Sequence, residues 1–541
     1  MRLGAMQDWP LRVTLLVDHA EREHGDAEIV SAWADGSITR TNWRAVARDA
    51  RKMAQALDRL GIKPGDRVAT LAMNHAHHLI AWYGTTGMGG VLHTINPRLF
   101  DDQLDYIANH AEDRVLLYDR AFTPIVERMK PKWRTIEHYI CMDPAEGDDV
   151  RGFRGWIDAE DGDYCWVEGD ERDPCGLCYT SGTTGNPKGV LYEHRSTMLH
   201  TFAQISPDIM GLSKQAVVLP IVPMFHANAW GVPWAAPATG AKLVLSADYR
   251  PERMCQLFRD EKVTHSAGVP TVWLTMIEHI ERTGEELGPL QKVTIGGSAA
   301  PRAMIRWLRA RGVEVGHAWG MTETSPIGTC GAPPRGWDAM SDDEQVEYIA
   351  RQGFAPFGVE LRTVDDEGNV LPRDGKSSGR LQCRGPWVIK RYFKAEEDAV
   401  EDGQWFDTGD VAVLHPDGTM QITDRSKDVI KSGGEWISSI ELENAAVGHP
   451  GVAEAAAIGI PHPKWDERPL LCVVRANGND VSAEEIREHL RKHVASWWIP
   501  DAIEFVDELP HTATGKLSKL QLRERFKDYR FADAEEMVGR D

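Results

Sequence analysis

The alternation of apolar and polar positions predicts a helix, a turn and a strand near the N-terminus. In "TNWRAVARDARKMAQALDRLGIKPGDRVATLAM" the apolar residues recur at spacings of three and four, which places them on one face of a helix. We expect Thr41 to cap this helix and Gly61 to end it. Pro64 and Gly65 then turn the chain into a strand from Val68 to Met73. The apolar positions are Trp43, Val46, Ala50, Met53, Leu57 and Leu60.

The same order of helix, turn and strand returns around "RVLLYD", "AVVLPIVP", "AKLVL", "VTHSAGVP" and "KVTIGGS". Alternating elements indicate doubly wound, mostly parallel α/β sheets with both faces covered, up to about residue 350. From about residue 353 the pattern changes to strands and turns, and "VELRTVDDEGNVLP" and "VAVLHPDGTMQITD" predict hairpins. We therefore expect a large N-terminal domain, 1–424, whose last part, 353–424, is a β-rich subdomain.

A second change of pattern follows "TDRSKDVIKSGGEW" and indicates a small, mobile α+β domain over 425–541, with a hinge near 424–427. Ser482 and Glu485 form a predicted capping box for a helix that runs through His493.

Composition and charge argue against some classes of binding partner. The formal charge of −21, from 61 basic and 82 acidic residues, argues against nucleic acid or an anionic membrane surface as a general partner. No run of about 18 apolar residues predicts a membrane span, and the N-terminus lacks a targeting pattern, so we expect a cytoplasmic protein. The eight dispersed cysteines indicate reduced thiols, and the lone C-x-x-C, Cys175 and Cys178, fits a strand better than a metal or redox site.

The stretch "LCYTSGTTGNPKGVLYEHR" has the composition of a phosphate cradle, because glycines, hydroxyls and Lys188 supply donors and charge. Its spacing is not that of the Walker loop, and Pro187 stands where the Walker helix would begin. A glycine-rich surface loop is the alternative interpretation. Two more small-residue clusters, "IGGSAAP" and "HAWGMTE", follow predicted strands, where doubly wound sheets collect ligands. Three such clusters in one α/β sheet favour a nucleotide as the bound ligand.

Six segments in order resemble the adenylate-forming superfamily of acyl-CoA synthetases, adenylation domains and luciferases, over nearly the whole chain. They are "YTSGTTGNPKG", "GGSAAP", "HAWGMTE", "WFDTGD", "DRSKDVIKSGGEWISSIELE" and "PHTATGK". Within that superfamily the chain is most similar to the fatty-acid–CoA ligase branch that includes 3-methylmercaptopropionate–CoA ligases. The resemblance implies that a carboxylate attacks the α-phosphorus of ATP, giving acyl-AMP and pyrophosphate, and that the thiol of CoA then displaces AMP.

The resemblance also implies roles for particular residues in the nucleotide site. Lys516 would bridge the carboxylate and the α-phosphate, Thr322 would donate to the α-phosphate, and Glu323 with Thr184 would position Mg²⁺. The phosphate loop would comprise Thr180, Ser181, Gly182, Thr183, Thr184, Gly185 and Lys188. The adenine slot would comprise Gly297, Ser298, Ala299, His317, Ala318, Trp319 and Gly320. Asp410, assisted by Arg425, would bind the ribose hydroxyls.

Lys427 would be the hinge about which the C-terminal domain rotates between the two half-reactions, as in the family. Residues expected to border the CoA channel are Lys431, Gly433, Gly434 and Glu435. Residues expected in the acyl pocket are His226, Asn228, Trp230 and Gly231, with Val232 and Trp234 as further apolar walls. His226 would lie at the mouth of this pocket and is included among the catalytic residues, although a packed core histidine is the alternative for it.

These apolar walls favour an aliphatic monocarboxylic acid, either a medium-chain fatty acid or 3-methylmercaptopropionate, because a thioether and a methylene fill similar space. A homodimer is compatible with the resemblance. Three alternatives stay open: adenylation with another acceptor such as a carrier protein, a non-catalytic protein that binds nucleotide or acyl groups, and γ-phosphoryl transfer, which would release ADP instead of AMP.

Overall fold

A computed structural model describes residues 5–143, 145, 150–180, 186–425, 427–432, 435–476, 478–511 and 517–531. The predicted amphipathic helix is α2 (Trp43–Arg59), and its apolar face is buried. Its cap is not the expected Thr41, which lies in β2 (Ile38–Asn42) and pairs with Ile29. Asn42 caps the helix instead, because its side chain accepts a hydrogen bond from Ala45 N at 3.0 Å.

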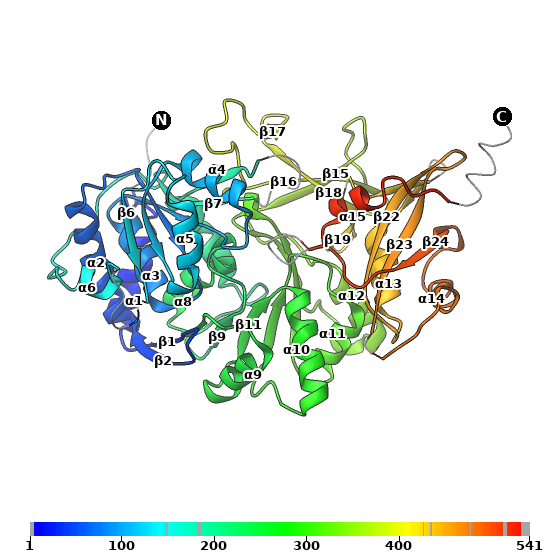
Figure 1. The fold of residues 1–541 in the computed structure, drawn as a ribbon, viewed down its shortest axis with the longest axis horizontal. Coiled ribbons are helices and arrows are strands. Elements are labelled where there is room, and N and C mark those ends of the chain that lie inside the picture. The colour runs from blue at the N-terminus through cyan, green and yellow to red at the C-terminus, as the bar shows by residue number, and fades with distance from the viewer. Residues whose placement is uncertain are drawn as a thin grey trace.

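One mostly parallel sheet runs through the lower middle of the molecule in Figure 1, with antiparallel strands at both edges. Its strands, in spatial order, are β14 (Ile327–Cys330), β13 (Glu314–Gly320), β12 (Lys292–Ile295), β11 (His265–Gly268), β9 (Val217–Pro220), β10 (Lys242–Ser246), β1 (Glu28–Ala32) and β2. This arrangement confirms the α/β pattern predicted for the first part of the chain.

A second sheet of the same kind lies in the blue and cyan part of Figure 1. Its strands, in spatial order, are β6 (His138–Cys141), β5 (Asp113–Tyr118), β3 (Arg67–Leu71), β4 (Val91–Thr94), β7 (Pro174–Tyr179) and β8 (Gly189–Glu193). The predicted strand ends at Leu71 instead of Met73, because Met73 N donates to the Asp119 carboxylate at 2.7 Å and leaves the ladder.

Helices pack on both sheets: α1 contacts α2, α3 and α8, and α3 contacts strands of both sheets. Buried residues of both sheets, such as Leu243 and Val68, belong to one hydrophobic core with these helices. The helices of this part are α1 (Thr14–His24), α2, α3 (Ala76–Gly87), α4 (Asp101–Ala111), α5 (Thr123–Met129), α6 (Phe153–Ile157), α7 (His194–Gln204), α8 (Val232–Thr239), α9 (Pro251–Asp260), α10 (Pro270–Thr283), α11 (Arg302–Arg309) and α12 (Asp342–Ala350). Short 3₁₀ segments are η1 (Arg120–Phe122), η2 (Ala227–Gly231), η3 (Thr322–Thr324), η4 (Trp337–Ala339) and η5 (Ser496–Trp498).

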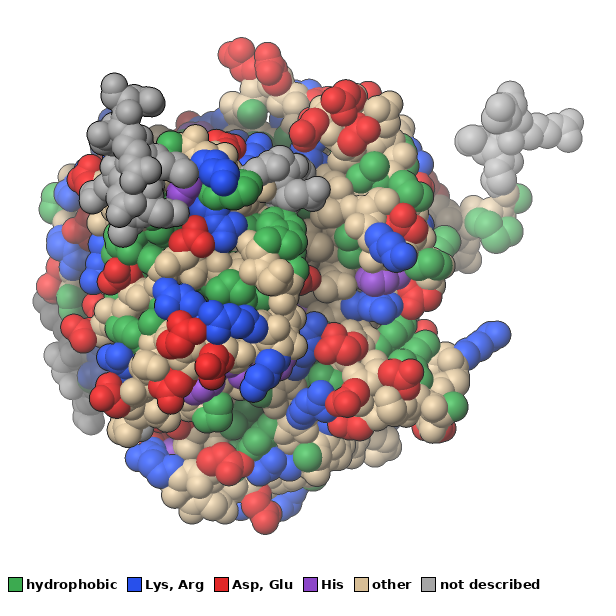
Figure 2. Space-filling model, turned by 90° about the vertical axis from the view of Figure 1, so that its right-hand side faces the viewer, with side chains coloured by type: hydrophobic (Ala, Val, Ile, Leu, Met, Phe, Trp, Pro, Cys, Tyr) green, Lys and Arg blue, Asp and Glu red, His purple; other side chains and the backbone are tan. Residues whose placement is uncertain are grey.

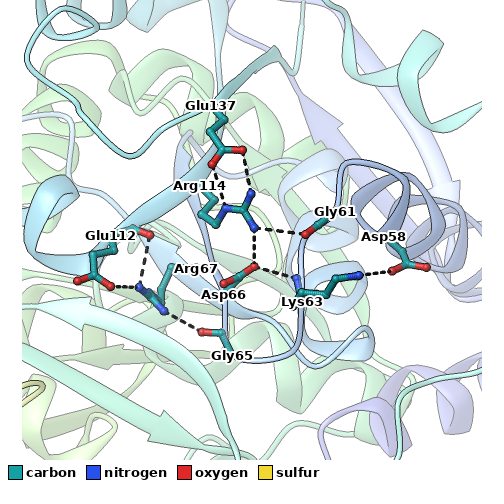
Figure 3. A network of polar contacts seen from close by, with 9 residues as sticks. All are labelled: Asp58, Gly61, Lys63, Gly65, Asp66, Arg67, Glu112, Arg114 and Glu137. Atoms are coloured by element: carbon teal, nitrogen blue, oxygen red, sulfur yellow. Dashed lines mark hydrogen bonds and ion pairs between the residues drawn. The ribbon is translucent and has the colours of Figure 1, made fainter.

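The turn between α2 and β3 is tied to the neighbouring strands by a polar network (Figure 3). Arg114 in β5 donates to Asp66 at 2.9 Å and pairs with Glu137 at 2.8 Å. Next to it, Arg67 pairs with Glu112 at 2.8 Å. The turn predicted from Pro64 and Gly65 is therefore held against the sheet by its charged neighbours.

The β-rich part forms an antiparallel sheet at the top of Figure 1. Its strands are β15 (Glu360–Val364), β16 (Ser378–Arg384), β17 (Val400–Glu401), β18 (Trp405–Leu414) and β19 (Met420–Arg425). The predicted hairpin of β18 and β19 is confirmed. The other predicted hairpin forms its turn, with Asp365 N bonded to Asn369 O, but Val370 makes a single bridge to Val364, and β15 takes β16 as its ladder partner.

The C-terminal part lies at the right of Figure 1 in orange and red. Its elements are β20 (Ile430–Ser432), β21 (Glu435–Ile437), α13 (Ser439–Val447), β22 (Val452–His462), β23 (Asp466–Arg475), α14 (Ala483–Leu490), β24 (Ala502–Phe505) and α15 (Lys519–Arg525). The capping box of Ser482 and Glu485 is confirmed. The helix ends at Leu490 instead of His493, because shorter-range turn bonds such as His493 N to Leu490 O replace the helical pattern.

All eight cysteines are free thiols, and Cys175 and Cys178 lie in β7 as expected. None of the helices within the described ranges has the length and apolar content needed to traverse a bilayer. On the face shown in Figure 2, acidic and basic side chains are interspersed.

Candidate active site

A cleft of about 690 Å³ brings together the three small-residue clusters and the β-rich sheet. It is lined on one side by the end of β7 and the loop that follows it, on another by the ends of β12 and β13, and on a third by β18 and β19. Expected site residues among its lining are Thr180, Lys188, His226, Trp230, Gly297, Ala318, Trp319, Gly320, Thr322, Glu323, Asp410, Arg425 and Lys427. Segments separated by more than 200 residues therefore share one cavity, as the carboxyl ends of strands do in doubly wound sheets.

The neck of the phosphate loop is closed by two hydrogen bonds. Thr180 N donates to Lys188 O at 2.9 Å, and Lys188 N donates to Thr180 Oγ1 at 3.2 Å. Both residues line the cleft. The tip of the loop, Ser181, Gly182, Thr183, Thr184 and Gly185, lies outside the described residues.

Tyr392 joins the phosphate loop to Glu323. Its hydroxyl donates to Glu323 Oε1 at 2.8 Å, and Lys188 Nζ lies 4.8 Å from the centre of its ring. Burial, with the neighbouring Glu323 carboxylate, raises the pKa of Tyr392, so the hydroxyl stays protonated and remains a donor. Tyr392 lines the cleft but was absent from the expected site residues, because a tyrosine in a loop after a strand carries no periodic or motif signal.

The segment around Tyr392 is anchored on both sides. Phe393 N donates to Gly189 O at 2.8 Å, directly after the phosphate loop, and Ile389 N donates to Glu323 O at 2.8 Å. Lys394 pairs with Glu112, which also pairs with Arg67 in the network of Figure 3. We call residues 387–394 the strap, because these bonds tie the phosphate loop to the Glu323 segment.

Glu323 and Thr322 lie in η3, directly after β13. The Glu323 side chain is buried, and Tyr192 supports the segment by donating from its hydroxyl to Thr322 O at 2.8 Å. A carboxylate at the cleft wall is an oxygen ligand of the kind that Mg²⁺ prefers. Glu323 therefore fits the expected metal role, while its expected partner Thr184 lies outside the described residues.

Asp410, Trp319 and Arg425 form a polar group at the β18 side of the cleft. Trp319 Nε1 donates to Asp410 Oδ2 at 2.8 Å, and Arg425 Nε lies 3.5 Å from Asp410 Oδ1. Gly409, just before Asp410, has a φ of +73°, which favours glycine. Both residues lie within β18, where its register with β16 shifts, so Asp410 lines the cleft from an irregular part of the strand.

Three expected residues of the adenine slot do not line the cleft: Ser298, Ala299 and His317. His317 is fully buried behind the wall, and burial lowers its pKa. Its Nδ1 lies 3.1 Å from Ala350 O and its Nε2 accepts from Ala300 N at 3.3 Å, which is the pattern of a neutral ring protonated on Nδ1. His317 therefore shapes the slot by holding the loop after β12.

The predicted acyl region contains a left-handed turn. Asn228, Ala229 and Trp230 have φ values of +54°, +50° and +54°, followed by Gly231 at +82°. Gln204 Nε2 holds the turn by donating to Trp230 O at 2.8 Å. Non-glycine residues in this region are strained and persist where their surroundings over-determine them.

Because of this turn, some of the residues expected in the acyl pocket face the cleft and others face the protein core. His226 and Trp230 line the cleft, whereas the Asn228 side chain points into the core and accepts a hydrogen bond from Trp82 Nε1 at 3.3 Å. Val232 and Trp234 are buried in α8, where the Trp234 ring lies 3.9 Å from that of Trp82, so they are core residues and not pocket walls. Apolar lining residues that sequence reasoning missed are Ile209, Met210, Phe225, Ile327 and Cys330.

The expected hinge and CoA residues lie at the start of the C-terminal part. Lys427 lines the cleft, and burial lowers its pKa. Lys431 is exposed in β20, and its backbone N donates to the Glu467 carboxylate at 3.0 Å. Glu435 begins β21, and its backbone is paired with that of Ser432 in β20. Gly433, Gly434 and Lys516 lie outside the described residues.

Comparisons with known proteins agree over nearly the full length of the chain. The sequence model of the AMP-binding enzyme family matches residues 17–393, and that of the AMP-binding enzyme C-terminal domain matches residues 441–516. A 3-methylmercaptopropionyl-CoA ligase of Ruegeria lacuscaerulensis is 49% identical, over 97% of this chain and 99% of the relative. A medium-chain-fatty-acid–CoA ligase of Ectopseudomonas oleovorans is 46% identical, over 97% and 98%.

Solved structures show the same fold. The crystal structure of an anthranilate CoA ligase in complex with anthranoyl-AMP has a TM-score of 0.85 and 25% identity, and the match covers 96% of this chain and 99% of that chain. The predicted architecture, a large α/β part followed by a smaller C-terminal part, is confirmed by this likeness.

Proposed function

The chain belongs to the family of AMP-binding enzymes, and from this we propose that it is an ATP-dependent acid–thiol ligase. The proposed reaction activates an aliphatic monocarboxylic acid as acyl-AMP, releases pyrophosphate, and transfers the acyl group to CoA with release of AMP. The observation that carries the proposal is the single cleft with three chemically different regions. Lys188 and Glu323 lie in one, Trp319 and Asp410 in another, and apolar side chains in the third.

Each region suits one part of the reactants. Lys188 and the donors of the phosphate loop would hold the β- and γ-phosphates, and Arg425 and Lys427 add positive charge to a chain that is acidic overall. Mg²⁺ bound at Glu323 would neutralise charge on the phosphate oxygens. The Asp410 carboxylate would accept hydrogen bonds from the ribose hydroxyls, and Thr322 would donate to the α-phosphate.

Lys516 completes the proposed adenylation site. In our proposal its ammonium bridges the attacking carboxylate oxygen and the α-phosphate, so that charge is stabilised as it moves from one to the other. The hinge at Lys427 then rotates the C-terminal domain, which begins at 425, to withdraw Lys516 and bring Lys431, Gly433, Gly434 and Glu435 to the thiol channel. One cleft would in this way serve two half-reactions.

The acid is proposed from the side chains of the third region. Ile209, Phe225 and Trp230 are apolar, and Met210 adds a flexible thioether to the wall. Such a wall accepts an unbranched tail and offers no charged partner for a second carboxylate or an amine. A medium-chain fatty acid or 3-methylmercaptopropionate fits this description. Relatives named as ligases of these two acids are identical to this chain at 46% and 49% of the aligned positions.

The proposal includes a cytoplasmic homodimer. The eight free thiols support a reducing compartment, and the dimer rests on the resemblance to the family. Light scattering coupled to size exclusion tests the dimer, with a mass near twice 60.4 kDa as the expected result.

The activity is tested by incubating the pure protein with Mg-ATP, CoA and a panel of acids. The panel comprises acetate to palmitate, 3-methylmercaptopropionate, phenylacetate and cinnamate, and the products measured are AMP, ADP, pyrophosphate and acyl-CoA. We expect AMP and pyrophosphate with a matching thioester, highest for the aliphatic acids. Adenylate without thioester would point to another acceptor, ADP would indicate γ-phosphoryl transfer, and absence of nucleotide turnover would overturn the enzyme proposal.

A further inference from the structure

A cluster of potential metal ligands lies away from the cleft, between α9 and α10. Cys255 comes from α9, His279 comes from α10, and Glu285 lies just after the Gly284 cap of α10. The Cys255 thiol and the His279 ring are buried, and the ligand atoms of all three side chains lie within 4.8 Å of one another. Within the described residues, neither helix contributes a side chain to the cleft lining, so the cluster is a separate feature of the molecule.

The hydrogen bonds of His279 show which ring nitrogen faces the cluster. Its Nε2 lies 3.0 Å from Glu285 Oε2, while its Nδ1 lies 3.3 Å from Arg282 Nη2 and 3.7 Å from Glu252 Oε1. Because a guanidinium can only donate, Nδ1 is the acceptor in this arrangement, and Nε2 carries the proton given to Glu285. Nε2 is therefore the nitrogen directed at the carboxylate side of the cluster.

A nucleophilic role does not explain these groups. The Cys255 thiol is fully buried, whereas a reactive cysteine needs access to solvent. The His279 ring is also engaged by Glu285 and Arg282 instead of serving as a base for the thiol. A thiol, an imidazole and a carboxylate that converge at short range suit a different chemistry, the binding of a borderline-soft divalent metal.

We propose that Cys255, His279 and Glu285 form a Zn²⁺ site that joins α9 to α10. The ligands are the Cys255 thiolate, His279 Nε2 and one Glu285 oxygen, with water in the fourth position. Tetrahedral zinc with its usual bond lengths holds neighbouring ligand atoms roughly 3.3–3.6 Å apart, and the 4.8 Å limit of this cluster is within reach of that spacing by side-chain rotation. The thiolate and the carboxylate together balance the charge of the ion.

Glu252 gives the site an outer partner. When zinc occupies Nε2, the ring proton moves to Nδ1, and Glu252 Oε1 at 3.7 Å is placed to accept it. A carboxylate that accepts from the second nitrogen of a metal-bound histidine is a recurring arrangement. Arg282, which now donates to Nδ1, is exposed and turns to solvent when the ring becomes a donor. Binding releases the thiol proton of Cys255, because the thiolate is the ligand.

The experiment uses the full chain after dialysis against a chelator, followed by titration with Co²⁺ as a spectroscopic substitute for Zn²⁺. We expect one equivalent to bind and to give a thiolate-to-cobalt charge-transfer band in the near ultraviolet, and Zn²⁺ to displace it. Cys255→Ser removes the band, and His279→Gln weakens Co²⁺ binding at least tenfold. Glu252→Gln weakens it about tenfold, as expected for an outer partner.

The matched control is Cys165→Ser, because Cys165 is the exposed thiol of this chain and the most accessible one for non-specific binding. This variant keeps the band if the proposal holds. Absence of a thiolate band in the unmodified protein overturns the site, and so does a band that persists in Cys255→Ser or that disappears in Cys165→Ser. Circular dichroism of each variant without metal verifies its fold, and the titration of the unmodified protein decides the question where a variant does not fold.

Discussion

Trp319 Nε1 donates a hydrogen bond to Asp410 Oδ2 at 2.8 Å and so connects two sheets across the cleft. Trp319 belongs to β13 of the α/β part, and Asp410 belongs to β18 of the β-rich part. Both side chains are largely buried. The bond fixes the orientation of the carboxylate that we propose for ribose binding and leaves Oδ1 near Arg425.

We predict that Trp319→Phe lowers kcat/KM for ATP about tenfold, mainly through KM. A hydrogen bond to a charged group is worth about 1.5–3 kcal/mol, and about 1.4 kcal/mol corresponds to a factor of ten. The measurement is the rate of pyrophosphate release at varied ATP. Trp405→Phe is the control, since Trp405 also lies in β18 but packs against Arg362 and not in the cleft. An unchanged KM for ATP in Trp319→Phe would contradict the ribose role of Asp410.

Lys516→Ala should abolish adenylation while largely sparing thioester formation from supplied acyl-adenylate. The physical reason is that the proposed charge bridge exists only while the carboxylate attacks the α-phosphate. Pyrophosphate exchange measures the first half-reaction, and acyl-CoA formation from synthetic adenylate measures the second. Lys527→Ala serves as the control, because Lys527 is an exposed lysine in the C-terminal part, where it pairs with Glu524. Equal loss of both half-reactions in Lys516→Ala would refute the assigned role.

Tyr392→Phe tests the strap. The change removes the hydroxyl that donates to Glu323 Oε1 but keeps the ring beside Lys188. We expect the Mg²⁺ concentration for half-maximal activity to rise several-fold, because the Glu323 carboxylate loses its orientation, with a smaller change in KM for the acid. Tyr392→Leu removes both contacts and should also raise KM for ATP.

The control for the strap is Tyr529→Phe, whose hydroxyl lies 3.2 Å from a different glutamate, Glu504. It should leave the Mg²⁺ dependence unchanged. If Tyr392→Phe alters the unfolding temperature but not the Mg²⁺ dependence, Tyr392 is a packing residue and our assignment fails.

Sequence patterns predict the layers of this fold well and the side-chain detail less well. The periodicity of α2 identifies its buried face, but Thr41 and Asn42 are both good capping residues. Strand β2 continues through Asn42, so the helix begins only at Trp43 and Asn42 takes the cap position. Likewise, the turn after Asp365 is visible in the sequence, but β15 finds its main partner in β16 because that strand completes the sheet. Tertiary pairing overrides local preference in both cases.

For the site, too, the sequence predicts the location but not the orientation of each side chain. The glycine-rich clusters locate the cleft, since they follow strands whose ends converge. Trp230 and Trp234 look equivalent in the sequence, but the left-handed turn directs Trp230 to the cleft and leaves Trp234 in the core. Tyr392 contacts Lys188 and Glu323, which lie far from it in the sequence. No local sequence pattern predicts such long-range contacts.

The acid sensitivity of folding provides a test at His194, the first residue of α7. Burial, followed by the charge of Arg12, lowers its pKa from 6.5 to about 3. Its Nδ1 accepts a hydrogen bond from Val13 N at 3.2 Å, so the folded protein requires the neutral ring. Because the folded pKa is depressed, the unfolded chain binds the proton first. The stabilising contribution is complete above about pH 6.5 and is lost progressively as the pH falls toward 3.

We predict that His194→Asn reduces this loss, because the Asn oxygen can accept from Val13 N but cannot take up a proton. Where the unfolded chain binds one proton more than the folded protein, the free energy of unfolding falls by about 1.4 kcal/mol for each pH unit of acidification. Between pH 7 and pH 5 the free energy of unfolding of the variant should therefore fall by about 2 kcal/mol less than that of the unmodified protein. Differential scanning fluorimetry at the two pH values measures this as a fall in unfolding temperature that is roughly 2 °C smaller. His493→Asn, at an exposed histidine, should behave like the unmodified protein. An equal fall in His194→Asn and in the unmodified protein would show that His194 is not kept neutral by folding.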